Sequence, residues 1–170
     1  QGAAKNASKI QTPHRYRTLR EGVWVCQGIL LGVKMAEKTP EDIALERIAE
    51  VETNNEKILN LSELDLRKLP VEIGKLKNLT HLYLAHNMLS SLPEEIAQLT
   101  NLVLLDCSFN RFKKYPKQIN TLTNLMALNL SENGIEEIPD DIASLVNLKS
   151  FDINDNSLKD IPNAIGRLTN

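Results

Sequence analysis

The sequence predicts an α/β solenoid, in which short parallel strands line one side of an arc and short helical segments line the other. Three observations carry this prediction. Residues 56–170 divide into five repeats of 23 residues with no insertion, apolar residues recur at the same six positions of each repeat, and a proline follows the fourteenth position every time. A single repeat of this length cannot bury its own leucines, so the repeats must stack into one continuous core.

Each repeat opens on a strand. The repeats span residues 56–78, 79–101, 102–124, 125–147 and 148–170. In the second repeat Leu82 and Leu84 stand at positions four and six, and this spacing puts both leucines on one face of a strand. Residues at positions three, five and seven then point away from the core. Stacking aligns these outward residues in columns about 4.8 Å apart.

A turn and a helical segment complete each repeat. An asparagine occupies position nine in every repeat but the first, which has Leu64 there. Its amide can bond backbone groups that would otherwise be buried without a partner, so we interpret the asparagine as structural rather than catalytic. The proline after position fourteen suits the first residue of a helix, and acidic residues such as Glu94 and Asp140 suit a helix amino end.

The repeat pattern L-x-x-L-x-L-x-x-N-x-L-x-x-L-P-x-x-I-x-x-L resembles the leucine-rich-repeat family, in the 23-residue type found in Ras-pathway scaffolds and bacterial intracellular proteins. The resemblance covers about two thirds of the chain. It implies a leucine-rich-repeat solenoid with a curved parallel sheet on the concave side, short helical segments on the convex side, and a role in binding.

The residues before the first repeat predict a helix that covers its open end. Thr39-Pro-Glu-Asp has the pattern of an N-cap, a first-turn proline and a capping acid. Within an amino-terminal cap of residues 35–55 we expect a helix from about Pro40 to Val51. Its apolar residues form one stripe against the first repeat: Ile43, Ala44, Ile48 and Val51. A helix that binds a partner is the alternative.

The two ends of the chain carry separate expectations. Residues 1–34 contain six basic residues and one acidic residue, whereas residues 35–170 carry a net charge of −7. We expect this basic leader to be disordered or non-native, and a targeting segment is the alternative. Its apolar run from Val23 to Val33 is too short to span a bilayer. No closing helix follows the fifth repeat, so we expect the array to be truncated at Asn170.

The outward columns supply the candidate binding residues. Their amino-terminal half is apolar and aromatic, whereas their carboxyl half is small, polar and mildly acidic. Since aromatic side chains often dominate binding energy, we predict that a protein partner contacts the concave face. The alternative is that exposed strand faces tolerate such side chains without a function. The predicted contact residues are Ile58, Asn60, His81, Tyr83, Leu104, Asp106, Phe109, Asn129 and Asp152.

Lysines gather in the third repeat and resemble an anion-binding patch. However, 23 residues after Lys113, Lys114 and Lys117 stand Glu136, Glu137 and Asp140, alongside them in the next repeat. Lys159 stands one repeat after Glu136, and Glu94 stands one repeat before Lys117. We therefore expect opposite charges to meet across the repeat boundary. Exposed pairs contribute roughly 0–1 kcal/mol each, which fits a role in register and solubility. With a net charge of −2, the chain has no general attraction for nucleic acid.

The sequence contains no motif for cradling phosphate, binding a dinucleotide, forming a nucleophile elbow or spacing zinc ligands. It therefore predicts a non-enzymatic adaptor or scaffold for intracellular signalling, with a protein partner, no cofactor and no membrane span. One alternative is the recognition arm of a larger enzyme, such as a Roco-type GTPase, a kinase or a ubiquitin ligase. Another is an extracellular or pathogen-sensing receptor, which the absence of cysteine-rich caps disfavours. The pattern makes no prediction of the oligomeric state.

Cysteine usage bears on the location of the protein. Cys26 and Cys107 are the two cysteines and form no disulfide framework, which favours a cytoplasmic protein. Cys107 stands at position six, a core leucine position, so we expect a buried and unreactive thiol.

Overall fold

The computed structural model describes residues 17–19, 23–26, 29–31 and 37–167. The chain divides into two compact units, residues 1–37 and 38–170. The first unit contains an antiparallel sheet in the order β1-β2-β3, made of β1 (Arg17–Leu19), β2 (Val23–Cys26) and β3 (Ile29–Leu31). No strand is predicted here from the sequence. That residues 1–34 are a disordered or non-native leader stays a prediction.

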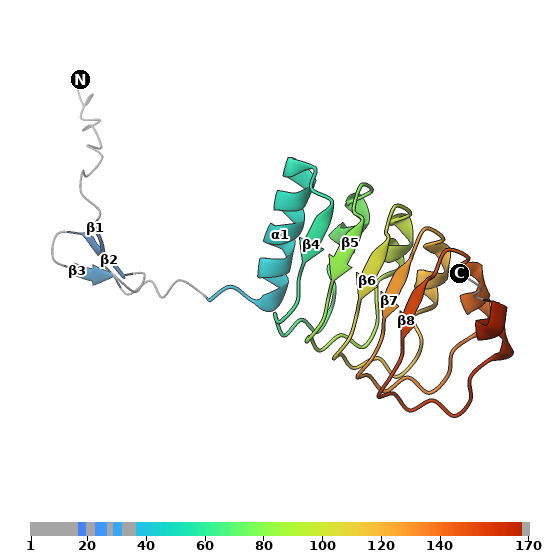
Figure 1. The fold of residues 1–170 in the computed structure, drawn as a ribbon. Coiled ribbons are helices and arrows are strands. Elements are labelled where there is room, and N and C mark those ends of the chain that lie inside the picture. Colours follow the sequence, from blue (N-terminus) through green and yellow to red (C-terminus); the bar gives the residue numbers. More distant parts are fainter. Residues whose placement is uncertain (1–16, 20–22, 27–28, 32–36, 168–170) are drawn as a thin grey trace, which may run out of the picture. The chain divides into compact units, whose positions relative to one another are not determined.

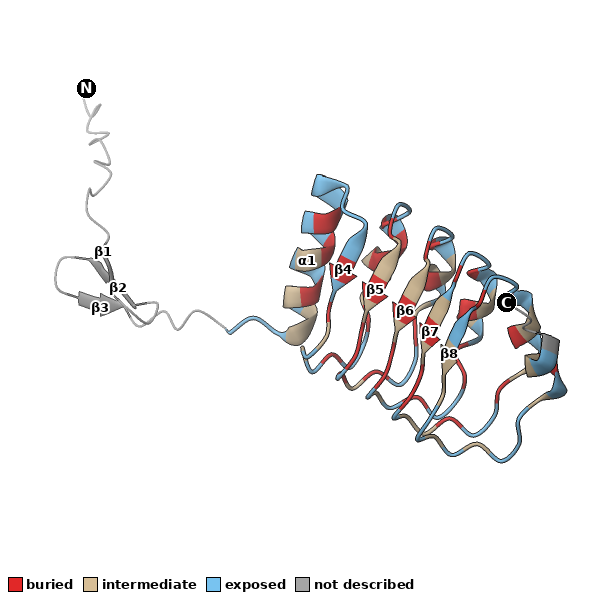
Figure 2. Cartoon of the chain, in the orientation of Figure 1, coloured by how far each residue is buried: buried red, intermediate tan, exposed pale blue. Residues whose placement is uncertain are grey.

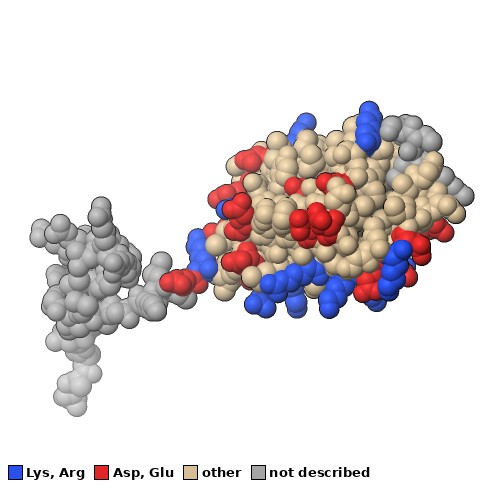
Figure 3. Space-filling view, turned by 60° about the horizontal axis from the view of Figure 1, so that its bottom comes forward, with Lys and Arg blue, Asp and Glu red and all other residues tan. Residues whose placement is uncertain are grey.

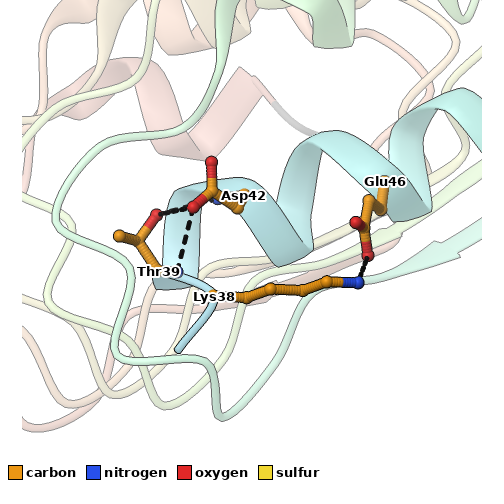
Figure 4. Close-up of polar contacts among 4 residues, drawn as sticks. All are labelled: Lys38, Thr39, Asp42 and Glu46. Atoms are coloured by element: carbon orange, nitrogen blue, oxygen red, sulfur yellow. Dashed lines mark hydrogen bonds and ion pairs between the residues drawn. The ribbon is translucent and has the colours of Figure 1, made fainter. Parts of the chain in front are cut away.

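The second unit opens on helix α1 (Pro40–Asn54), which begins at the predicted residue and runs further than the predicted Val51. Thr39 and Asp42 form a reciprocal capping box, shown in Figure 4. The Asp42 N–H donates to Thr39 Oγ1 over 3.1 Å, and the Thr39 N–H donates to Asp42 Oδ2 over 3.0 Å. The cap therefore satisfies amide groups that the first helical turn leaves unpaired.

The apolar stripe of α1 faces the first repeat. Ala44, Ile48 and Val51 are buried, while Ile43 is half-buried. The helix packs against β4 (Ile58–Asn60), and Arg47 Nη1 donates to the Asn60 carbonyl over 2.8 Å. The helix thus joins the hydrophobic core of the repeats.

We expect Thr39→Ala to lower the free energy of unfolding by about 1 kcal/mol, the typical cost of losing an N-cap side chain. Hydrogen bonds from Thr39 lower the pKa of Asp42 below its ordinary value of 3.8. A carboxyl group whose pKa falls on folding stabilises the fold above its unfolded pKa and loses that contribution as pH falls through the folded value. Urea denaturation at several pH values should show the deficit of Thr39→Ala narrowing below about pH 4. A deficit independent of pH would contradict this role of Asp42.

The repeats form one parallel sheet in the order β4-β5-β6-β7-β8. The strands after β4 are β5 (His81–Tyr83), β6 (Leu104–Asp106), β7 (Ala127–Asn129) and β8 (Ser150–Asp152). Ile58 pairs with His81, and His81 pairs with Leu104, so residues 23 positions apart are neighbours. The predicted columns at positions three and five are confirmed.

A short 3₁₀ helix follows the proline of each repeat, on the other side of the sheet (Figure 1). Five residues are enough for i→i+3 hydrogen bonds, such as the one that the Ile73 N–H donates to the Pro70 carbonyl over 3.2 Å. The predicted helical segments are confirmed as η1 (Val71–Lys75), η2 (Glu94–Gln98), η3 (Lys117–Thr121), η4 (Asp140–Ser144) and η5 (Asn163–Arg167).

The core lies between the sheet and these helices. Figure 2 shows the buried middle residue of β4 to β7, which is the leucine at position four of each repeat. Cys107 is fully buried as predicted, and burial raises the pKa of its thiol. The fifth repeat is less enclosed, since Phe151 and Ile153 are half-buried and Ile161 is 69% exposed.

The asparagine at position nine bonds the backbone of two successive repeats. Asn87, only 7% exposed, donates from Nδ2 to the carbonyl oxygens of Leu61 (2.8 Å) and Leu84 (3.0 Å). Its Oδ1 accepts the N–H groups of Leu64 (3.2 Å) and Leu66 (2.9 Å). Asn110, Asn133 and Asn156 repeat the pattern. The structural interpretation of this asparagine is confirmed.

Candidate binding surface

Eight of the nine predicted contact residues lie on the five strands, on the sheet face opposite the 3₁₀ helices. We call the face formed by positions three and five the concave face. Ile58 and Asn60 are exposed at its amino-terminal end. The other six strand residues are half-buried: His81, Tyr83, Leu104, Asp106, Asn129 and Asp152.

The centre of the concave face contains an open hollow of about 230 Å³. Five predicted residues line it: Tyr83, Leu104, Asp106, Asn129 and Asp152. Ala127 and Ser150 also line it, although the sequence analysis left them out of the predicted set. Both residues stand at position three, and this position in the repeat was the signal that could have predicted their place in the hollow. Ile58, Asn60, His81 and Phe109 lie outside the hollow.

Position five also shapes the turn after each strand. Asp106 Oδ1 accepts the Ser108 N–H over 3.0 Å and the Ser108 hydroxyl over 2.7 Å, and Asn129 accepts the same two groups from Ser131. These contacts bury Ser108 and Ser131. Both hydroxyl groups bond the outward side chain at position five, which agrees with the prediction that position seven points away from the core.

Phe109 belongs to a different feature at the rim of the sheet. Its ring stacks on His86, with the ring centroids 4.2 Å apart and the planes inclined by 12°. Both residues stand at position eight with positive φ, 55° for His86 and 51° for Phe109. The sequence analysis omitted His86 from the predicted contact residues, although its spacing of 23 residues from Phe109 was a signal for their contact.

The predicted pairing of opposite charges holds for one pair. Lys159 Nζ lies 2.8 Å from Glu136 Oε2, and this contact raises the pKa of Lys159 and lowers that of Glu136. Within residues 37–167, Lys113, Lys114 and Lys117 form no ion pair within 4.0 Å. The charges of Lys113 and Lys114 still lower the pKa of Glu136, so opposite charges meet across this boundary without a direct contact. Glu94 instead accepts a hydrogen bond from Gln118 over 2.7 Å.

The described residues contain no group of three or more His, Cys, Asp or Glu side chains that could hold a metal ion. None of the helices in the described part is both long and apolar enough to cross a membrane. The concave face has mixed apolar and acidic character, since Tyr83 and Leu104 line the same hollow as Asp106 and Asp152. Such a face suits contact with another macromolecule.

Comparison with known families agrees with this geometry. A family profile described as a leucine-rich repeat region matches residues 54–133, and a second leucine rich repeat profile matches residues 117–170. The chain belongs to the leucine-rich-repeat family, and its fold is an α/β leucine-rich-repeat solenoid. Domains of this family generally mediate protein–protein interaction and are typically non-catalytic. No curated protein matches the sequence.

Solved structures extend the comparison. A leucine-rich-repeat protein of Leptospira interrogans shares 39% identity at a TM-score of 0.60, over 61% of this chain and 26% of that one. The plant peptide hormone receptor RGFR1, in complex with RGF2, shares 37% identity at a TM-score of 0.56, over 61% of this chain and 17% of the receptor. A third structure is the ectodomain of the receptor kinase GASSHO1/SCHENGEN3 from Arabidopsis thaliana, in complex with CASPARIAN STRIP INTEGRITY FACTOR 2. It shares 34% identity at a TM-score of 0.55, over 60% of this chain and 13% of that one. The chain thus spans about a quarter or less of the length of these proteins.

Proposed function

We propose that the repeat array binds a protein partner through the concave face and serves as an adaptor or scaffold. The hollow around Tyr83, Leu104 and Asp106 carries the proposal, because an aromatic ring, an aliphatic side chain and a carboxylate converge there. Buried aromatic anchors commonly supply most of the binding energy of an interface. The similar receptor structures were solved as complexes with RGF2 and CASPARIAN STRIP INTEGRITY FACTOR 2, which supports a binding role.

The chemistry of the hollow indicates what the partner presents. Asp106 Oδ1 accepts two hydrogen bonds from Ser108, and the second carboxylate oxygen is the atom that we propose for ligand binding. Asp152 adds a second carboxylate to the same hollow. A partner with an apolar group for Tyr83 and Leu104 and a basic group for the two acids therefore fits this surface.

We also propose a cytoplasmic location and intracellular signalling role, because the repeat array holds one cysteine, Cys107, and that thiol is fully buried. Fractionation of cells that produce the native protein tests this location, and recovery from the secreted fraction would contradict it. The recognition arm of a larger enzyme stays an alternative prediction.

Tyr83→Ala combined with Leu104→Ala tests the proposed surface. We expect capture of the partner, followed by quantitative mass spectrometry, to fall by roughly thirtyfold in affinity, since interface anchors contribute about 2 kcal/mol or more. The circular-dichroism spectrum should stay unchanged, because both side chains are only half-buried.

A matched control separates the concave face from apolar surface in general. Val71 is 54% exposed on η1, on the opposite side of the sheet, so Val71→Ala should leave capture unchanged. Equal capture by the native chain and the double variant, or an equal loss in Val71→Ala, would place the binding surface elsewhere.

A further inference from the structure

A second hollow lies between repeats two and three, on the loops that follow the strands. Its volume is about 980 Å³, against about 230 Å³ for the hollow of the concave face, and the two share no lining residue. Leu92, Phe112 and Tyr115 are buried beneath it and form an apolar floor. Arg111, Lys113, Lys114 and Lys117 line it as well. We call the surface of residues 90–92 and 111–117 the basic groove.

The basic groove is open because the two loops separate at position twelve. Ser90 and Ser91 occupy positions twelve and thirteen, where the first repeat has Arg67-Lys68 and the third has Lys113-Lys114. Small side chains in the second repeat therefore leave space beside larger ones.

The backbone hydrogen bonds show the same separation. The Glu136 N–H donates to the Lys113 carbonyl over 3.4 Å, and the Lys159 N–H donates to the Glu136 carbonyl over 3.3 Å, both at position twelve. Among the backbone bonds of the described residues, the equivalent bonds from Lys113 to Ser90 and from Ser90 to Arg67 are both missing. The Pro116 ψ of 96° also differs from the 140° to 155° of Pro70, Pro93 and Pro139.

The cations of the basic groove form no ion pair within 4.0 Å among the described residues. The two ion pairs within residues 37–167 join Lys38 to Glu46 and Lys159 to Glu136. Lys113 and Lys114 lower the pKa of Glu136 less than Lys159 does, because Lys159 bonds it directly. One carboxylate lines the groove, that of Glu94, and Gln118 donates to it. Four cations thus surround an apolar floor beside a single acid. Figure 3 shows basic side chains gathered along the edge formed by these loops.

We propose that the basic groove is a second docking site, and that its occupant is an acidic peptide segment of a protein partner. An apolar side chain of the segment packs on the floor over Leu92 and Tyr115. Flanking carboxylates pair with Lys113, Lys114 and the two other cations, since opposite charges across an interface speed and orient association.

A peptide fits this site better than a nucleic acid does. The apolar floor requires an apolar side chain, which a phosphate backbone cannot supply. Residues 35–170 also carry a net charge of −7, which repels an extended polyanion beyond the groove itself.

Display selection of a random peptide library on the full chain tests the proposal. We expect enrichment of peptides that combine several Asp or Glu residues with an aromatic or aliphatic residue. Binding of a selected, fluorescein-labelled peptide should weaken roughly tenfold or more in Lys113→Glu combined with Lys114→Glu, and it should weaken as salt is raised. Ser91→Trp fills the groove without a change of charge and should block the same peptide.

Matched controls locate the peptide. Arg67→Glu combined with Lys68→Glu reverses the same two positions in repeat one, which do not line the groove, and should weaken binding less than Lys113→Glu/Lys114→Glu does, because charge interactions decrease with distance. Tyr83→Ala combined with Leu104→Ala should leave binding unchanged, so failure of the concave-face proposal is distinguishable from failure of this one.

Three outcomes would overturn the proposal. The first is enrichment without acidic residues, and the second is equal binding to the native chain and to folded Ser91→Trp. The third is a failed selection together with binding of phosphatidylserine vesicles or duplex DNA that Lys113→Glu/Lys114→Glu abolishes, which would assign the groove to a membrane or to nucleic acid.

Discussion

Asn87→Ala is expected to lower the free energy of unfolding by on the order of 3 kcal/mol, because several buried backbone groups lose their partners together. Asn87 bonds the carbonyl groups of Leu61 and Leu84 and the N–H groups of Leu64 and Leu66. An unpaired buried backbone group costs about 1–3 kcal/mol, and the space left by the amide admits little water for replacement. Urea denaturation followed by circular dichroism measures the loss.

Asn101→Ala is the matched control for this experiment. Asn101 is exposed and donates one hydrogen bond, to the Lys77 carbonyl over 2.8 Å, which water can replace. We expect Asn101→Ala to cost less than about 1 kcal/mol. Similar losses of unfolding free energy in the two variants would show that the asparagine at position nine stabilises the fold no more than a surface hydrogen bond does.

The first repeat shows why position nine needs an amide. Leu64 stands there, and the element preceding that repeat is α1 rather than another turn. At position five, the Asn60 carbonyl accepts a hydrogen bond from Arg47 of α1, where the carbonyl of Tyr83 accepts the Leu61 N–H of the preceding repeat. Because Asn87 follows a repeat rather than a helix, Asn87→Leu should be as destabilising as Asn87→Ala, although leucine is native at position nine of repeat one.

The repeat register could be predicted from sequence because a fixed period of 23 residues makes every residue the neighbour of its equivalent. Ile58 beside His81 and Tyr83 beside Asp106 follow from counting alone. The capping box of α1 was predictable for a similar reason, since Thr39 and Asp42 are three residues apart and their contact is local.

Features that depend on the distance between neighbouring loops could not be predicted by counting residues along the repeat. Lys113 stands one period before Glu136, yet Lys159 forms the ion pair with Glu136 and Lys113 lines the basic groove. The small side chains of Ser90 and Ser91 open that groove, and nothing in the period marks their effect. The low exposure of Ser108 could not be predicted either, because sequence alternation gives the side of the strand on which a side chain lies and not the hydrogen bond that it forms with Asp106.

The strands β1 to β3 were missed because residues 17–31 lie outside the repeat. Where no repeat pattern applies, a short apolar segment such as Val23–Cys26 can form a strand, a helix or a loop. The flanking residues favour one of these three structures only weakly.

Phe112→Ala is expected to cost about 3–5 kcal/mol, the range for removing a buried aromatic ring from a core. Phe112 is fully buried at position eleven of the third repeat. Phe109→Ala is the control, since Phe109 is 45% exposed and stacks on His86, so its loss should cost about 1 kcal/mol. Thermal and urea unfolding of both variants measure the difference. A larger loss in Phe109→Ala would contradict the assigned core.

Phe112→Ala should also change the cooperativity of unfolding, because Phe112 lies in the middle of the stack of repeats. Each repeat contacts only its neighbours, so cooperativity of unfolding depends on every interface between repeats. Phe112 lies in the third of five repeats, and its backbone carbonyl accepts a hydrogen bond from the Gly134 N–H of the fourth over 2.8 Å. A cavity there should weaken the coupling of the amino-terminal repeats to the carboxyl-terminal ones. We therefore expect the urea transition of Phe112→Ala to broaden with a reduced m-value, whereas Phe109→Ala keeps the native slope.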